Sequence, residues 1–335
     1  MFHRILVPLD DDASEVKTPD IASATPSAQG GEKAQHAGRS VLLQVARTFA
    51  ERMGAEVLLL HVDPKARPFS FAEHFTHYAA DSEGLNNAAH ALVEDGFGAK
   101  AISEIGDPVK VILHAAATRH PDVILMAPHH RHGLAALRQP SVTERVMAQA
   151  PTPVLVWPDT PSADAPHPAT LLGTAAALVI VPLDGSPLAE HALPFAAELA
   201  RDYATPLLLL RVTPMVVSLA HSAEALQMER EVMAEEGRAA RRYLHDTRQR
   251  MEQETGLCVQ SMMQTGDIVD EIVALAEAHP GSLVVMCSHG RTGMARTVLG
   301  SVSTAVMRRT STPLLVIPAR TLAINPPHVH ATQHS

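Results

Sequence analysis

Short runs of apolar residues alternate along this chain with longer segments in which apolar and polar residues recur at helical spacing. Residues 283–286 and 313–317 are continuously apolar, which is typical of parallel strands covered on both faces. The longest helical segment, residues 220–255, is rich in Ala, Glu, Arg, Met and Gln and stops at Gly256, a residue type that commonly ends helices. The alternation predicts open α/β sheets of parallel strands.

The second half of the chain repeats the pattern of the first. An offset of 160 residues aligns the apolar run 123–126 with 283–286, and the same offset aligns Gly106-Asp107 with Gly266-Asp267. Three further pairs of segments match: 5–10 with 179–184, 58–64 with 208–214, and 152–156 with 312–316. The repeat predicts two tandem domains of one α/β fold.

Composition places the domain boundaries between these repeats. The first domain is predicted at residues 1–158 and the second at 177–320, joined by a linker rich in Pro, Ala and Ser at 159–176. Residues 321–335 are predicted to be a disordered tail. An insertion from about Asp11 to His36 reads as a flexible loop.

Charge and residue usage exclude several classes of protein. The net charge of −9 provides no basic surface for duplex nucleic acid, and 3% aromatic residues offer little to stack single-stranded bases on. The apolar runs are too short for a membrane helix, which needs about 20 residues. With two cysteines among 335 residues, a disulfide framework is not expected, and we expect a cytoplasmic protein.

One loop carries the chemistry of a ligand site. Residues 286–303 join an apolar strand to a helical segment, and Gly290 and Gly293 let the backbone approach a bulky group. Gly300-Ser301 stands where the helix begins, and the free amides of a helix start bind anions. Asp184 follows another strand at the same predicted sheet edge, where open α/β sheets bind ligands. A phosphate is the expected occupant.

These segments together resemble the universal stress protein family in its tandem two-domain form. The resemblance is carried by residues 181–186 (VPLDGS), Gly266-Asp267, residues 288–293 (SHGRTG), Gly300-Ser301 and Thr312-Pro313. It implies a Rossmann-like fold of the adenine nucleotide alpha hydrolase type, and ATP, with Mg²⁺, as a regulatory ligand. It also implies that residues 154–157 and 314–317 pair within one chain as a pseudo-dimer of domains, and that chains form homodimers.

The family's ATP motif assigns the site residues. The motif is Gly, two residues, Gly, nine residues, Gly, then Ser or Thr; Gly290, Gly300 and Ser301 fit it, and Cys287 stands at the first glycine position. The resemblance places Asp184 on the ribose and Pro182 and Val212 around the adenine. It places one group of residues near the phosphates or sugar: Met286, Cys287, His289, Gly290 and Arg291. It places a second group on the triphosphate: Gly300, Ser301, Val302 and Ser303.

The first half lacks this motif. His130 aligns with Gly290 and Pro140 with Gly300; a histidine side chain fills the space a glycine leaves, and a proline has no amide for a phosphate. We therefore expect one nucleotide per chain, in the second domain.

Several site residues have a structural interpretation as well. Asp184, Ser301 and Ser303 are also typical of helix starts, and Cys287 is either a reactive thiol or a small apolar filler at a strand end. Asp107 and Asp267 occur in both halves, which favours a helix-capping role. No ligand pattern accompanies the loop histidines His129, His130 and His132, so no metal site is predicted.

Two other functions remain open from the sequence. The sites are either remnants in a nucleotide-free adaptor that binds another protein, or they support slow ATP hydrolysis or self-phosphorylation at Ser301 or Ser303. The sequence offers no general base for the second of these. Regulatory ATP binding by a protein that is not an enzyme is the leading hypothesis.

Overall fold

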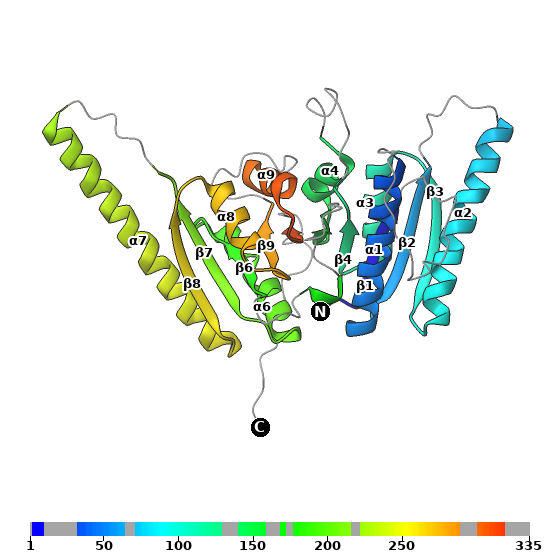
Figure 1. Cartoon of the computed structure of the whole chain (residues 1–335), viewed down its shortest axis with the longest axis horizontal. Coiled ribbons are helices and arrows are strands. Elements are labelled where there is room, and N and C mark those ends of the chain that lie inside the picture. The colour runs from blue at the N-terminus through cyan, green and yellow to red at the C-terminus, as the bar shows by residue number, and fades with distance from the viewer. Residues whose placement is uncertain are drawn as a thin grey trace. The chain divides into compact units, whose positions relative to one another are not determined.

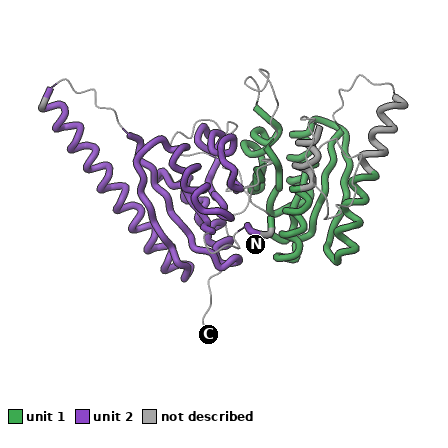
Figure 2. The backbone as a smooth tube through the Cα atoms, viewed as in Figure 1, with its two compact units in different colours: residues 1–169 green, residues 170–335 purple. Residues whose placement is uncertain are grey.

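The computed structural model describes residues 2–9, 32–63, 71–128, 140–158, 168–171, 177–215, 222–288 and 300–318. The chain divides into two compact units, Met1–Ala169 and Thr170–Ser335 (Figure 2). Between the predicted domains lies a short 3-10 helix, η2 (Pro168–Thr170), and Leu171 directly after it is buried. Predictions on residues 321–335 fall outside the described residues.

The described part of the first unit is a parallel five-stranded sheet with helices between its strands (Figure 1). The strand order is β3-β2-β1-β4-β5, and each neighbouring pair is parallel. The strands are β1 (Arg4–Leu9), β2 (Glu56–Asp63), β3 (Ala99–Ile105), β4 (Val123–Met126) and β5 (Val154–Val156). The helices are α1 (Glu32–Met53), α2 (Phe71–Glu94), α3 (Pro108–Arg119) and α4 (Val142–Gln149).

The second unit repeats this topology. Its strand order is β8-β7-β6-β9-β10, which is the order of the first sheet with each strand replaced by its counterpart in the repeat. The strands are β6 (Val179–Pro182), β7 (Leu207–Thr213), β8 (Val259–Thr265), β9 (Leu283–Cys287) and β10 (Leu314–Ile317). The helices are α5 (Pro187–Glu190), α6 (Leu193–Asp202), α7 (Ala223–Thr255), α8 (Ile268–Glu277) and α9 (Ser301–Arg309). The predicted fold class, two tandem open parallel sheets, is confirmed.

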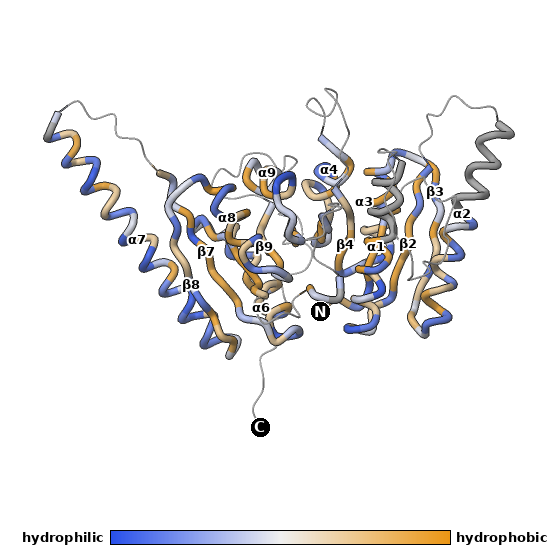
Figure 3. Tube along the Cα trace, in the orientation of Figure 1, coloured by the Kyte–Doolittle hydropathy of each residue, from blue (hydrophilic) through white to orange (hydrophobic). Residues whose placement is uncertain are grey.

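Both faces of each sheet are covered by helices. The chain moves outward from β6 to β8 and then returns to β9 on the other side of β6. Because parallel crossovers are right-handed, α6 and α7 cover one face and α8 and α9 the other. The inner strands are correspondingly hydrophobic along most of their length (Figure 3), and every residue of β9 and β10 is buried.

Most predicted helix ends are found where the sequence places them. The side chains of Asp107 and Asp267 accept backbone hydrogen bonds at the starts of α3 and α8, which confirms their capping role. Gly256 ends α7 in the left-handed conformation, with φ of 68°. One boundary was wrong: α1 already begins at Glu32, inside the segment interpreted as a loop to His36. None of the described helices is long and apolar enough to span a membrane.

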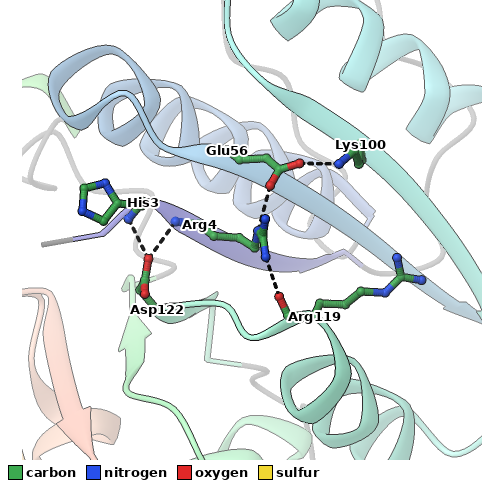
Figure 4. A network of polar contacts seen from close by, with 6 residues as sticks. All are labelled: His3, Arg4, Glu56, Lys100, Arg119 and Asp122. Atoms are coloured by element: carbon green, nitrogen blue, oxygen red, sulfur yellow. Dashed lines mark hydrogen bonds and ion pairs between the residues drawn. The ribbon is translucent and has the colours of Figure 1, made fainter. Parts of the chain in front are cut away.

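The amino-terminal ends of the strands in the first unit are tied together by charged side chains (Figure 4). Asp122 accepts hydrogen bonds from the amides of His3 and Arg4, at 2.7 and 2.9 Å. The Arg4 side chain donates to Glu56 at 2.7 Å, and Lys100 donates to the same carboxylate at 2.6 Å. Hydrogen bonds from Lys100 and then from Arg4 hold the pKa of Glu56 below its usual value of 4.5.

This lowered pKa predicts an acid-sensitive contribution to stability. A carboxylate whose pKa is lower in the folded state stabilises the fold above its unfolded pKa, and this contribution is lost as the pH falls through the folded pKa. We expect wild type to lose about 1 kcal/mol more than Glu56→Gln between about pH 6 and about pH 3, a modest value because the partners are solvent-screened. Urea unfolding at both pH values, followed by the fluorescence of the single tryptophan, Trp157, measures it. Equal losses in the two proteins would contradict the assignment.

Candidate functional site

The order in which strands are added to the sheet of the second unit reverses between β6 and β9. β7 and β8 lie on one side of β6, and β9 and β10 lie on the other. In open α/β sheets, ligands bind outside the carboxyl ends of the strands at such a switch point. β6 and β9 pair in parallel, with Val179 beside Leu283 and Ile180 beside Val284. The same register carried forward brings Asp184, after β6, alongside Ser288, after β9. The fold therefore brings two separately predicted segments of the site to one edge.

Asp184 lies in a tight turn that is fixed by hydrogen bonds. Its Oδ1 accepts from the amide of Ser186 at 2.9 Å, and Ser186 Oγ in turn accepts from the amide of Ala189 at 3.2 Å, capping α5. Gly185 between them has φ of +80°, a conformation in which a side chain is strained. Ser186, not Asp184, is thus the residue that caps the helix, and Asp184 shapes the turn before it.

Cys287 is the last residue of β9 and is buried, with 6% of its surface exposed. Burial raises the pKa of its thiol to about 12; the backbone amide of Ala192 opposes this shift, and the charge of Asp184 adds to it. Such a thiol stays protonated and shielded, because the thiolate is the reactive form. Of the two interpretations of Cys287, the geometry favours the small apolar filler. The parallel pairing of β6 with β9 brings the ends of these two strands close in space.

The two cysteines are expected to differ in thiol chemistry. Cys258 is exposed and Cys287 is buried. A maleimide reagent near neutral pH is expected to modify the folded protein once per chain, at Cys258, because Cys287 supplies almost no thiolate. Mass spectrometry of the labelled protein measures the stoichiometry.

The variant Cys258→Ser is the matched control for this labelling. It is expected to stay unlabelled when folded and to take up one label in urea. Rapid labelling of folded Cys258→Ser would restore the interpretation of Cys287 as a reactive thiol.

The end of β9 and the start of α9 are joined by hydrogen bonds. The amide of Gly300 donates to the carbonyl of Ser288 at 2.7 Å, and the buried hydroxyl of Ser303 donates to the same carbonyl at 3.1 Å. Ser288 itself donates to Ile317 of β10 at 2.9 Å. The residue that follows β9 and the residues that begin α9 are therefore anchored to one another beside the switch point.

The start of α9 has free amides that suit an anion, although one nearby amide is already used within the protein. Gly300 is the N-cap residue and provides no side-chain acceptor, so the cap does not neutralise the first amides of the helix, those of Ser301, Val302 and Ser303. The Gly300 amide, however, is used within the protein. The Ser303 hydroxyl also donates to the carbonyl of Gly300, at 3.0 Å. Phosphate binding at this helix would therefore use its first-turn amides and the exposed Ser301.

The remaining predicted residues are distributed around this edge. Pro182 ends β6, Val212 lies near the end of β7 and Met286 is buried in β9, so each belongs to the carboxyl end of a strand. Three predicted residues lie outside the described residues: His289, Gly290 and Arg291. The histidines of the corresponding first-half loop, at 129, 130 and 132, also lie outside them. Among residues that the structure describes, no cluster of three metal-binding side chains is found.

The corresponding helix start in the first unit is closed by its own side chains. Ser141 caps α4 by accepting from the amide of Glu144 at 3.1 Å, and Glu144 accepts from the amide of Ser141 at 2.9 Å, a reciprocal capping box. Glu144 is buried, with 5% of its surface exposed. A carboxylate therefore already occupies the end of this helix. Sequence reasoning missed Glu144, although Ser-x-x-Glu before a helix is its signal.

The buried hydroxyl at the start of the helix is common to both units. Thr143, aligned with Ser303, donates to the carbonyl of Ala127 at 2.8 Å just after β4. Because a unit without the glycine motif makes a similar bond to a carbonyl just after its strand, the hydroxyl of Ser303 has a structural role in joining helix to strand. The helix starts differ instead in their caps, Gly300 against Ser141 with Glu144.

Comparisons with known proteins agree with this architecture. A profile of the Universal stress protein family matches residues 34–158 and 178–318. A universal stress protein of Methanocaldococcus jannaschii is 29% identical over 140 residues, which cover 42% of this chain and 80% of that protein. The crystal structure of a universal stress protein from Archaeoglobus fulgidus has a TM-score of 0.60 at 20% identity, over 94% of this chain and 96% of that one.

A smaller relative has been solved with a nucleotide. It is the crystal structure of a universal stress protein in complex with cAMP. Its match to the present protein spans 43% of this chain and 97% of the cAMP-bound chain, with a TM-score of 0.33 and 23% identity. Both halves of the present chain match the family profile, and both build the same strand order. The chain belongs to the universal stress protein family and carries two of its domains in tandem.

Proposed function

We propose that this protein binds ATP, with Mg²⁺, in its second unit and that the nucleotide is a regulatory ligand in a cytoplasmic stress response. The observation that carries the proposal is the difference between the two equivalent helix starts. α9 begins at a glycine that leaves its first amides without a side-chain cap, whereas α4 is closed by Ser141 and Glu144. Helix amides of the first kind bind phosphate.

Two further features support a nucleotide rather than a small anion. Asp184 stands at the switch point beside β9, and a carboxylate accepts hydrogen bonds from ribose hydroxyls. Val212 and Pro182 lie at the ends of neighbouring strands, where an adenine ring would contact apolar surface. Mg²⁺ in such sites is held largely by phosphate oxygens and water, so it needs few protein ligands here.

Calorimetric titration of the full chain with ATP and Mg²⁺ tests the proposal. We expect one nucleotide per chain and weaker binding of cAMP, which has no β and γ phosphates. Asp184→Asn is expected to bind about tenfold more weakly, because a hydrogen bond to a charged acceptor contributes about 1.5–3 kcal/mol. Asn keeps the acceptor for Ser186, and Asp246→Asn, on the exposed face of α7, is the matched control.

The outcomes separate the alternatives. A chain that binds no adenine nucleotide would instead favour the adaptor function, which the Cys287 departure from the glycine motif also favours. Release of ADP and phosphate by the purified protein would make ATP a substrate. Two nucleotides per chain would contradict the assignment to the second unit.

A further inference from the structure

Arg211 on β7 reaches across to the turn that carries Asp184. Its Nη1 donates to the carbonyl of Leu183, the residue before Asp184, at 3.1 Å. A Cβ built on Gly185 would lie 3.5 Å from the same nitrogen. The half-buried guanidinium therefore packs directly against the turn from Leu183 to Gly185.

This side-chain hydrogen bond lies just beyond the last backbone hydrogen bond between β6 and β7. The last bond between β6 and β7 is from the Leu183 amide to the carbonyl of Leu210, at 2.8 Å. One step later, the carbonyl of Leu183 accepts from the Arg211 side chain. A carbonyl at a strand exit would otherwise rely on water, and a fixed guanidinium donor gives it one defined direction.

The charge of Arg211 also affects a side chain of α7. Tyr243 of α7 has a raised pKa, mainly from burial and then from Glu190, and the charge of Arg211 acts in the opposite direction. Glu190 at the end of α5 is joined to Arg250 of α7 at 2.6 Å. The ion pair between Glu190 and Arg250 thus connects α5, which follows the Asp184 turn, with α7.

We propose that Arg211 is a positioning residue for Asp184 and thereby sets the selectivity of the nucleotide site for the ribose hydroxyls. The proposal rests on the proposed function. The turn is held at its start by Arg211 on Leu183 and at its end by Ser186, whose amide donates to Asp184. With both ends fixed, the carboxylate has a defined direction. The internal repeat places His61 in the first unit at the position of Arg211, so the arginine donor occurs only in the unit with the glycine motif.

The first test needs no ligand. Hydrogen exchange of the backbone amides is measured for wild type, Arg211→Met and Arg201→Met, an exposed control on α6. In Arg211→Met, the amides of Ser186 and Ala189 are expected to exchange about tenfold faster, whereas amides of β6 keep their protection. Arg211→Lys, which retains one donor, is expected to recover part of this protection. Unchanged exchange at Ser186 in Arg211→Met would overturn the positioning role.

The second test measures ribose selectivity. Arg211→Met is expected to bind ATP about tenfold more weakly than wild type, and 2′,3′-dideoxy-ATP almost as well as wild type binds it. In the Asp184→Asn background, the arginine substitution is expected to have little further effect, because both changes remove one interaction. Equal losses for the two nucleotides would overturn the selectivity role. If wild type binds no adenine nucleotide, the proposed function fails, and the exchange measurement still decides the positioning of the turn.

Discussion

Thr304→Glu is expected to bind ATP about thirtyfold more weakly than wild type. Thr304 lies in the first turn of α9 and aligns with Glu144 of the first unit. A carboxylate at this place would occupy the end of the helix where the proposed phosphates lie. Repulsion between two like charges at about 4 Å is worth about 1–4 kcal/mol near a protein surface, which corresponds to the expected loss.

The helix itself should tolerate this substitution. An acidic residue in the first turn interacts favourably with the helix dipole, so unfolding without nucleotide is expected to be nearly unchanged. Thr304→Gln is the matched control, because both variants lose the hydrogen bond from the Thr304 hydroxyl to the carbonyl of Gly300, at 3.0 Å. Calorimetric titration measures both affinities. Equal affinities of the Glu and Gln variants would place the phosphates away from α9.

Features carried by neighbouring residues were predictable from the sequence. The caps at Asp107 and Asp267 and the end of α7 at Gly256 each depend on a residue type next to a periodic segment, and the structure confirms all three. The fold class follows from the same level of information, since buried apolar runs that alternate with helical segments are typical of parallel α/β sheets. The internal repeat indicates each of these elements a second time, in the other half of the chain.

Contacts between distant residues were not predictable in the same way. The bond from Arg211 to Leu183 spans 28 residues, and the bond from Ser303 to Ser288 spans 15. A hydroxyl in a phosphate motif reads as a ligand from sequence, but its partner depends on which strand end lies beneath the helix. Glu144 is different, because its capping box with Ser141 is a local signal. Glu144 aligns with Thr304 and not with a glycine of the motif, so the glycine positions of the two halves give no sign of it.

Removal of the Glu144 carboxylate should show that the first helix start is occupied for structural reasons. Glu144→Ala is expected to lower the free energy of unfolding of the first unit by about 2 kcal/mol, because it breaks the capping box and leaves the Ser141 amide without this acceptor. Glu144→Gln keeps an oxygen for that amide and is expected to lose less than about 1 kcal/mol. Trp157 is buried in the first unit at 2% exposure, so its fluorescence during urea unfolding reports this change.

The same variants distinguish a structural cap from a simple block of a second nucleotide site. Pro140 still lacks an amide and the first half still lacks the glycine loop, so Glu144→Ala is expected to keep a stoichiometry of one ATP per chain. A stoichiometry of two would mean that the carboxylate alone closes the first unit. If Glu144→Ala loses stability and the stoichiometry stays at one, the carboxylate at the start of α4 stabilises the fold of the first unit. A fixed internal carboxylate interacts with the same amides that a phosphate would need, so this helix start is not available to a nucleotide in the native protein.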